Sequence, residues 1–168
     1  RTIFTGIVEN VGILCTSTND VFVYYIETTD DDVDAISSID DFATPTTWMD
    51  TPQSLLRPSC AMTSDDNILC CAINQTVGGA GTLVYADSYG WNVEFSVNAN
   101  GATDNTDECD IEVDKDEEWY IVGIGTDQDD IDIWSSAING FGDTNRLQLY
   151  VGGAYTAEDG ISIAIRRI

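Results

Sequence analysis

The hydrophobic positions of this chain gather in short runs that recur at a nearly constant interval. The three runs are Val21–Ile26, Ile68–Ile73 and Trp119–Ile124, and their starts are 47 and 51 residues apart. β-branched and aromatic residues fill them, and no segment keeps a helical period for three turns. The pattern therefore predicts an all-β chain that is built from an internal repeat.

Turn-forming residues separate further strands around each run, in the same order each time. The predicted strands are 12–16, 21–28, 33–38 and 46–49, then 59–63, 68–75, 82–87 and 91–97, then 109–113, 118–125, 131–136 and 146–151. The repeats span about residues 12–50, 57–98 and 108–151, with terminal strands in 1–9 and 161–168. A repeat of ~40–50 residues with several short strands is typical of a β-propeller blade. We expect one domain over residues 1–168, made of propeller-like blades of four antiparallel strands, with a β-sandwich or jelly roll as the alternative.

The number of predicted blades does not show how a propeller ring would close. Three repeats give three blades, whereas closed propellers typically have about 4–8. The two terminal strands could pair into a fourth blade, several chains could close a ring together, or the chain could be part of a longer array. We expect a homo-oligomer.

The turn before the fourth strand carries related residues in each repeat. They are Ser38, Asp40 and Trp48 in the first repeat, Asp87, Gly90 and Trp91 in the second, and Asn139 and Gly140 in the third. These segments resemble degenerate copies of the Asp-box, Ser-x-Asp-x-Gly-x-Thr-Trp, of sialidase-like propellers. The resemblance covers about residues 12–151, and it implies tight turns in which the Asp or Asn side chain accepts backbone N–H groups and the Trp packs beneath.

The resemblance does not extend to sialidase catalysis. Sialidases use an arginine triad, a Tyr–Glu nucleophile pair and an Asp acid, but Arg57 is the only arginine here in a suitable inner-strand context. The chain also contains no histidine, the commonest general base. We therefore assign no catalytic residues and expect a protein that is not an enzyme.

The charge balance excludes some classes of partner. The chain has 30 acidic and 6 basic residues, a formal net charge of −24. Such a surface repels nucleic acid and anionic lipid. No apolar run approaches the ~20 residues of a membrane span, so membrane insertion is not expected. An Asp-rich, Lys-poor composition resembles that of halophilic proteins. In molar salt the repulsion between the negative charges of such a protein is screened.

Three further features are candidate sites. One acidic run could hold Ca²⁺ or be a solvated turn, and no other cofactor is expected; its carboxylates belong to Asp127, Asp129, Asp130 and Asp132. Cys60 and Cys71 would face each other in a hairpin centred between Asp65 and Asp66, which permits a disulfide, although all the cysteines could equally be free thiols. Asn74 begins an N-glycosylation sequon.

These observations favour a non-enzymatic extracellular structural or recognition protein. Its most concrete form is a virion surface component of a halophilic or marine virus, such as a capsid decoration, turret or tail-fibre module. The expected partners are neighbouring virion or surface-assembly subunits and host glycans. The alternative is a carbohydrate-active or glycan-binding secreted β-propeller.

Overall fold

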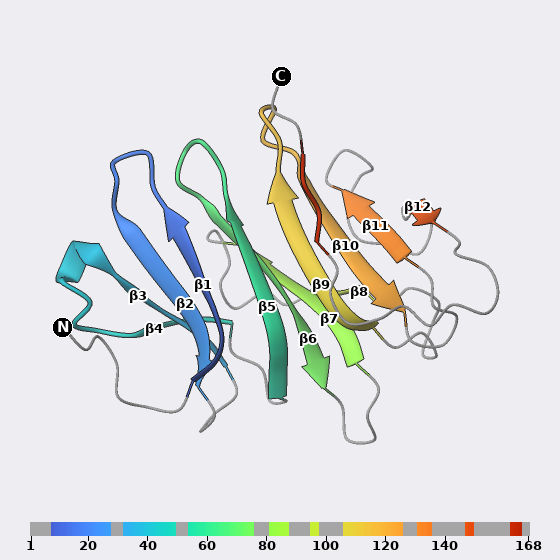
Figure 1. Cartoon of the computed structure of the whole chain (residues 1–168), viewed down its shortest axis with the longest axis horizontal. Coiled ribbons are helices and arrows are strands. Elements are labelled where there is room, and N and C mark those ends of the chain that lie inside the picture. The colour runs from blue at the N-terminus through green and yellow to red at the C-terminus, as the bar shows by residue number, and fades with distance from the viewer. Residues whose placement is uncertain are drawn as a thin grey trace.

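A computed structural model describes residues 8–27, 32–49, 54–75, 81–87, 95–97, 106–125, 131–135, 147–149 and 162–165. These residues form an all-β fold, as the sequence predicts, in which three four-stranded antiparallel sheets lie side by side (Figure 1). In each sheet, strands that follow one another in the chain are neighbours. Each sheet is therefore an antiparallel meander of the kind expected for a propeller-like blade.

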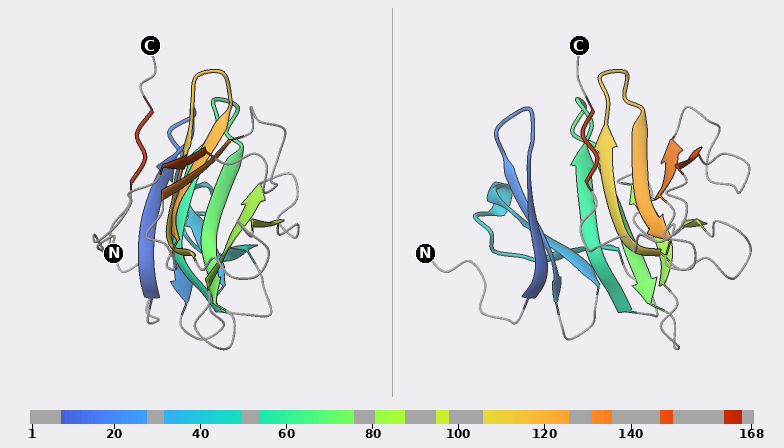
Figure 2. Two further views of the ribbon diagram at one scale, coloured as in Figure 1. Left: turned by 90° about the vertical axis from the view of Figure 1, so that its right-hand side faces the viewer. Right: turned by 45° about the vertical axis from the view of Figure 1, so that its right-hand side comes forward.

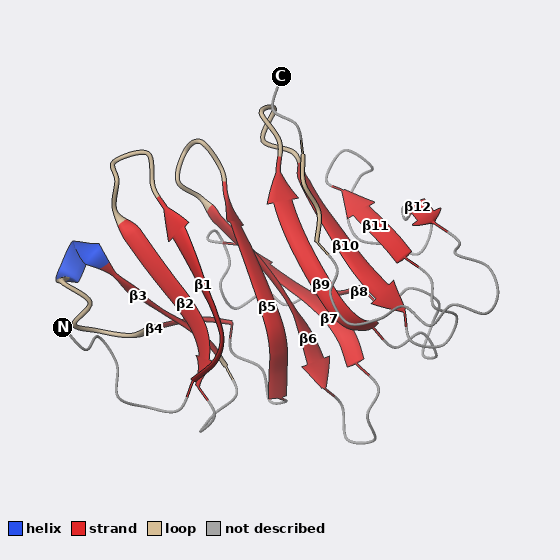
Figure 3. Ribbon diagram, in the orientation of Figure 1, coloured by secondary structure: helices blue, strands red, loops and turns tan. Residues whose placement is uncertain are grey.

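The strands alternate with short connections throughout the described chain (Figure 3). The first sheet contains β1 (Val8–Cys15), β2 (Val21–Glu27), β3 (Val33–Ser37) and β4 (Thr46–Met49), with the 3₁₀ turn η1 (Ser38–Asp40) after β3. The second contains β5 (Ser54–Met62), β6 (Ile68–Gln75), β7 (Gly81–Asp87) and β8 (Phe95–Val97). The third contains β9 (Thr106–Val113), β10 (Trp119–Gly125), β11 (Ile131–Ser135) and β12 (Leu147–Leu149).

The strand register reproduces the repeat that the sequence predicts. The pairs that close the first hairpin of each sheet are Cys15 with Val21, Met62 with Ile68, and Val113 with Trp119. Inside these pairs the N–H of Thr16, Thr63 or Asp114 donates to the carbonyl oxygen four residues later, which leaves a three-residue loop. The last residue of each loop is left-handed, namely Asn19, Asp66 or Glu117. This is a type I turn followed by a G1-type bulge. All three turns lie at the same end of the molecule (Figure 2).

The terminal strands predicted for a fourth blade lie only partly within the described residues. Val8 belongs to β1, which continues to Cys15, so the predicted strands 1–9 and 12–16 overlap one longer strand. Residues 162–165 belong to no strand, and the Ile163 N–H donates to Asp110 Oδ2 on β9 at 2.8 Å. Residues 1–7 lie outside the described part, so pairing between the two termini stays a prediction.

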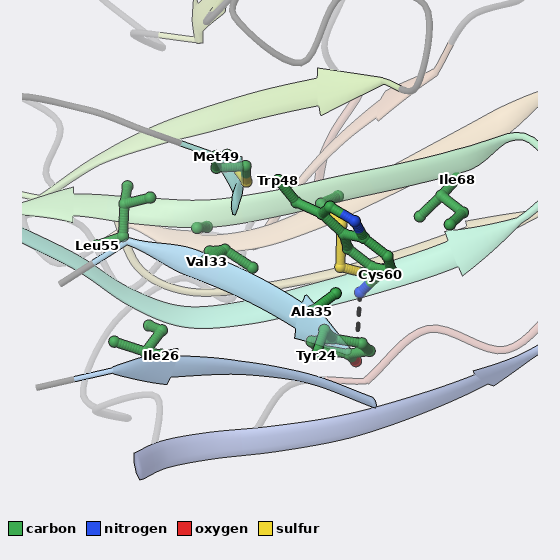
Figure 4. Close-up of a cluster of buried hydrophobic side chains, with 11 residues drawn as sticks. Tyr24, Ile26, Val33, Ala35, Trp48, Met49, Leu55, Cys60 and Ile68 are labelled. Carbon is green, nitrogen blue, oxygen red and sulfur yellow. Dashed lines mark hydrogen bonds between the residues drawn. A yellow bond between two sulfur atoms is a disulfide. The ribbon is translucent and has the colours of Figure 1, made fainter. Parts of the chain in front are cut away.

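Two buried clusters join the three sheets. The first cluster lies between the first and second sheets (Figure 4), and its members are Tyr24, Ile26, Val33, Ala35, Trp48, Met49, Leu55, Cys60, Ile68, Cys70 and Ala72. The second cluster lies between the second and third sheets, and its members are Ala61, Leu69, Cys71, Ile73, Cys109, Ile111, Val113 and Ile121. Successive residues of β5 and β6 alternate between the two clusters, as side chains of a strand must. The middle sheet is therefore buried on both faces.

The disulfide joins Cys60 to Cys70, and the predicted pairing of Cys60 with Cys71 is wrong. Because the left-handed Asp66 adds one residue to the turn, the hairpin is centred on Asp65, and Cys60 lies opposite Cys70. A shift of one residue moves a side chain to the other face of the sheet. Cys71 accordingly lies in the second cluster, where burial and a hydrogen bond with Cys109 raise the pKa of its thiol well above the usual value.

Removing the disulfide is expected to destabilise the fold by about 2–3 kcal/mol, because the bond closes a loop of about ten residues in the unfolded chain. A Cys60→Ala/Cys70→Ala variant should unfold at lower urea than the oxidised wild type. A reducing agent should lower the stability of the wild type and leave that of the variant unchanged. If peptide mapping under oxidising conditions finds Cys71 in the bridge, the register described above is wrong.

In the described residues, no helix is long and apolar enough to cross a membrane.

Candidate functional site

The first strands of two sheets bulge at equivalent positions. The register shifts between Glu9 and Gly12 in β1 and between Leu56 and Ser59 in β5. Within these bulges Asn10 and Arg57 have φ values of 51° and 52°, so both are left-handed. A bulge turns a side chain away from the regular alternation of a strand and is frequent beside functional sites. The two bulges stand 47 residues apart, the interval of the repeat.

A hollow of about 340 Å³ opens where the bulges face the third sheet. Its lining includes Asn10, Arg57, Ser59, Glu108, Cys109 and Asp110. These residues come from β1, β5 and β9, which are the first strands of the three sheets. In Figure 1 these three strands run in the same direction beside one another. The hollow therefore lies at the line along which the sheets meet.

An ion pair across two sheets organises the hollow. Arg57 Nη1 donates to Glu108 Oε1 at 2.8 Å. The Arg57 side chain is 41% exposed and that of Glu108 is 15% exposed, so the carboxylate is the more deeply held partner. A guanidinium carries five N–H donors. Arg57 thus joins β5 to β9 across the hollow through one of these donors.

A second carboxylate is fixed by several donors. The Ser59 hydroxyl donates to Asp110 Oδ1, and the backbone N–H of Ile111 donates to the same oxygen at 3.0 Å. The other oxygen, Oδ2, accepts the Ile163 N–H. The Cys109 thiol lies 3.6 Å from the Arg57 carbonyl oxygen. The hydrogen bonds to Asp110 hold its carboxylate in place in the lining of the hollow.

The arrangement places a cation, two carboxylates, an amide and a hydroxyl around one small hollow. Such a set offers donors and acceptors at fixed positions, which suits a neutral ligand that is rich in hydroxyl groups. The described residues that line it include no aromatic ring.

The turn around η1 contains the residues of the first predicted Asp-box-like segment. The Asp40 carboxylate accepts the N–H groups of Ala43 and Thr44 at 3.3 and 2.9 Å. The Ser38 hydroxyl accepts the Val21 N–H at 2.8 Å. Trp48 is buried in the first cluster. No glycine occupies the left-handed positions, which belong to Asp41 and Phe42. Membership of the Asp-box family stays a prediction.

The other predicted turn residues are not brought to the hollow. Asp87 ends β7, and its side chain lies outside what the structure describes. The remaining predicted positions lie outside the described residues, and they are Gly90, Trp91, Asn139 and Gly140.

The predicted calcium and glycan attachment sites both stay predictions. Asp132 lies on β11, and Asp127, Asp129 and Asp130 lie outside the described residues, so the calcium site stays a prediction. Among the described residues, no group of three or more His, Cys, Asp or Glu could hold a metal ion. Asn74 lies in β6 and is 8% exposed, and its glycosylation stays a prediction.

Sequence reasoning singled out Arg57 but missed its neighbours in the hollow. The signal that could have found two of them is the repeat itself, because Asn10 precedes Arg57 by 47 residues and Glu108 follows it by 51. The three residues are therefore at equivalent positions of the sequence repeat, although Glu108 pairs with Ile124 whereas Asn10 and Arg57 lie in bulges. Asp110 likewise follows Ser59 by 51 residues.

Comparison with known proteins supports the fold and gives no family. No protein-family model matches the chain, and no curated protein matches it. Among solved structures, a fucose lectin from Kordia zhangzhouensis in complex with methyl-fucoside is similar, with a TM-score of 0.50 and 13% sequence identity. The match covers 87% of this chain and 99% of that chain. At this identity the likeness concerns the fold alone.

Proposed function

We propose that this chain is a glycan-binding module that recognises the hydroxyl groups of a neutral sugar in the hollow between β1, β5 and β9. The observation that carries the proposal is the pair of Arg57 and Glu108, which places a charged donor beside a charged acceptor at 2.8 Å. Vicinal sugar hydroxyls both donate and accept, and charge-assisted hydrogen bonds are the stronger ones. The similar fold of a fucose lectin supports the same assignment.

The charge of the site favours neutral sugars over acidic ones. Glu108 and Asp110 both line the hollow, and the chain carries a net charge of −24. A carboxylated sugar would place a like charge beside these groups, which costs free energy. A host glycan with neutral terminal sugars is the class of ligand that the site suits best. A place on a virion surface stays a prediction, and the proposal does not depend on it.

Replacing Arg57 is expected to weaken sugar binding by about tenfold or more, since a hydrogen bond to a charged group contributes about 1.5–3 kcal/mol. The measurement is a titration of methyl-fucoside and other neutral methyl-glycosides into wild type and Arg57→Gln by calorimetry. Arg57→Lys should retain part of the affinity, because it keeps the charge and loses the planar fork.

Lys115→Gln is the matched control. It also removes one positive charge, but Lys115 lies in the turn after β9, away from the hollow. This variant should bind as the wild type does. The proposal fails if no neutral glycoside binds at millimolar concentration, or if Arg57→Gln and Lys115→Gln bind equally well.

A further inference from the structure

The contact between neighbouring sheets is made twice in the same way. On β5, Cys60 and Met62 pack toward the first sheet in the first cluster. On β9, Ile111 and Val113 pack toward the second sheet in the second cluster. These two pairs are separated by the 51-residue interval of the repeat. Each later sheet thus covers the preceding one with the same two positions of its first strand.

Among the described residues, no preceding sheet lies against the same two positions on β1. They are Ile13 and Cys15, which lie 47 residues before Cys60 and Met62. Ile13 is 64% exposed, and Val11, on the same face of the strand, is 60% exposed. Cys15 is exposed as well. A row of apolar side chains in open solvent on a strand is a typical mark of an interface.

The hairpin turns repeat a second contact between neighbours. The Ser17 N–H donates to Asp66 Oδ1 at 2.7 Å, which joins the first turn to the second. The Ser64 N–H donates to Glu117 Oε1 at 3.1 Å, which joins the second turn to the third. In both contacts the second residue of one turn bonds to the left-handed residue of the next. The following step of this series would join the Lys115 N–H to the left-handed Asn19 of a further first sheet.

We propose that two copies of this chain close a ring of six blades, with the exposed face of β1 in each copy packed against the third sheet of the other. The occupant is a second copy because, among the described residues, the next step of both contact series requires the residues of another first sheet. Closed propellers have about 4–8 blades, and two chains of three blades fall in that range. In the junction, Asn10 of one copy stands beside Glu108 of the other, so each junction extends the inner-strand site.

Salt controls this association. Each chain carries a net charge of −24, so the two copies repel each other in dilute buffer. At about 1 M salt the Debye length falls to about 3 Å, and the repulsion is screened. The dimer should therefore form at high salt and dissociate as the salt concentration is lowered.

The first test measures native mass by light scattering behind size exclusion at about 1 M and about 0.1 M NaCl. The wild type should have the mass of two chains at high salt. Ile13→Glu should be a folded monomer, because the interface would bury an unpaired carboxylate and the dissociation constant would rise about 100-fold or more. Ile39→Glu is the matched control, since Ile39 is 66% exposed and lies in η1. A monomeric wild type at both salt concentrations, or a dimeric Ile13→Glu, overturns the proposal.

The second test distinguishes the head-to-tail junction from a face-to-face dimer. In a Cys15→Ser background, an Asn19→Cys chain and a Lys115→Cys chain are mixed at high salt and oxidised. Disulfide-linked pairs should form in the mixture and not with either chain alone. Cross-linking of Asn19→Cys with itself would show that two first sheets meet, which overturns the head-to-tail ring. Sugar binding at Arg57 and Glu108 lies within one chain, so these outcomes are independent of the glycan test.

Discussion

Replacing Trp48 by alanine is expected to lower the free energy of unfolding by about 3–5 kcal/mol. Trp48 is 3% exposed, and its ring centroid lies 5.6 Å from that of Phe22 and 6.3 Å from that of Tyr24. Its removal leaves a cavity in the first cluster, between the first and second sheets, that the surrounding strands cannot fill. Because natural domains have about 5–15 kcal/mol of stability in total, this change should remove a large fraction of it.

Urea unfolding at a fixed high salt concentration measures the effect. Trp48→Phe keeps an aromatic ring in the cluster and should cost clearly less than Trp48→Ala. Ile39→Ala changes an exposed apolar residue and should lie within about 0.5 kcal/mol of the wild type. A loss for Trp48→Ala as small as that of Ile39→Ala would show that Trp48 does not connect the two sheets.

The strand pattern was predictable wherever turn chemistry bounds an apolar run. The predicted strands 46–49 and 68–75 coincide with β4 and β6. The start of β6 follows from the turn over Asp65–Asn67, whose residues favour left-handed and side-chain-capped conformations. The interval of the repeat was also sufficient to align the three sheets, because residues at equivalent positions form equivalent strand pairs.

The bulged strands were not predictable in the same way. Asn10 and Pro58 both favour turns, so the predicted strands began after them at residues 12 and 59. In the structure β1 and β5 continue through these residues as bulges, with Asn10 and Arg57 left-handed. A local pattern cannot distinguish a bulge from a turn, since both use the same residues and only pairing with the next strand separates them. The hollow was missed for the same reason.

The sequence also could not predict the strand register of the first hairpin of the second sheet to within one residue. The difference between Cys60–Cys71 and Cys60–Cys70 depends on one left-handed residue, Asp66. Propensity places a turn at Asp65 and Asp66 but does not say whether its loop has two or three residues. Glycines commonly take the left-handed position, and its occupation by an aspartate removed the usual signal.

Replacing Gly12 by alanine is expected to lower the free energy of unfolding by about 3–4 kcal/mol. This is at or above the upper end of the usual cost of forcing extra atoms into a packed core. A Cβ at position 12 would lie 2.1 Å from Cζ and 2.2 Å from the hydroxyl oxygen of Tyr24, which is its strand partner. The Tyr24 hydroxyl oxygen also accepts the Cys60 N–H at 3.3 Å, a bond between the first and second sheets that Figure 4 shows. The ring must leave this place before the methyl group can fit.

A double-mutant cycle with Tyr24 isolates the clash, because residues in contact show non-additive effects. Gly12→Ala should be nearly neutral in a Tyr24→Ala background, where the ring is absent. It should remain costly in a Tyr24→Phe background, because the Cζ atom that meets the new methyl group is still present. In the other two sheets the residue at the position of Gly12 is larger than glycine, and its partner at the position of Tyr24 is smaller than tyrosine. These pairs are Ser59 with Cys71 and Asp110 with Val122. An equal cost of Gly12→Ala in all three backgrounds would show that its effect is not steric, and the packing of Tyr24 over the first strand would then be wrong.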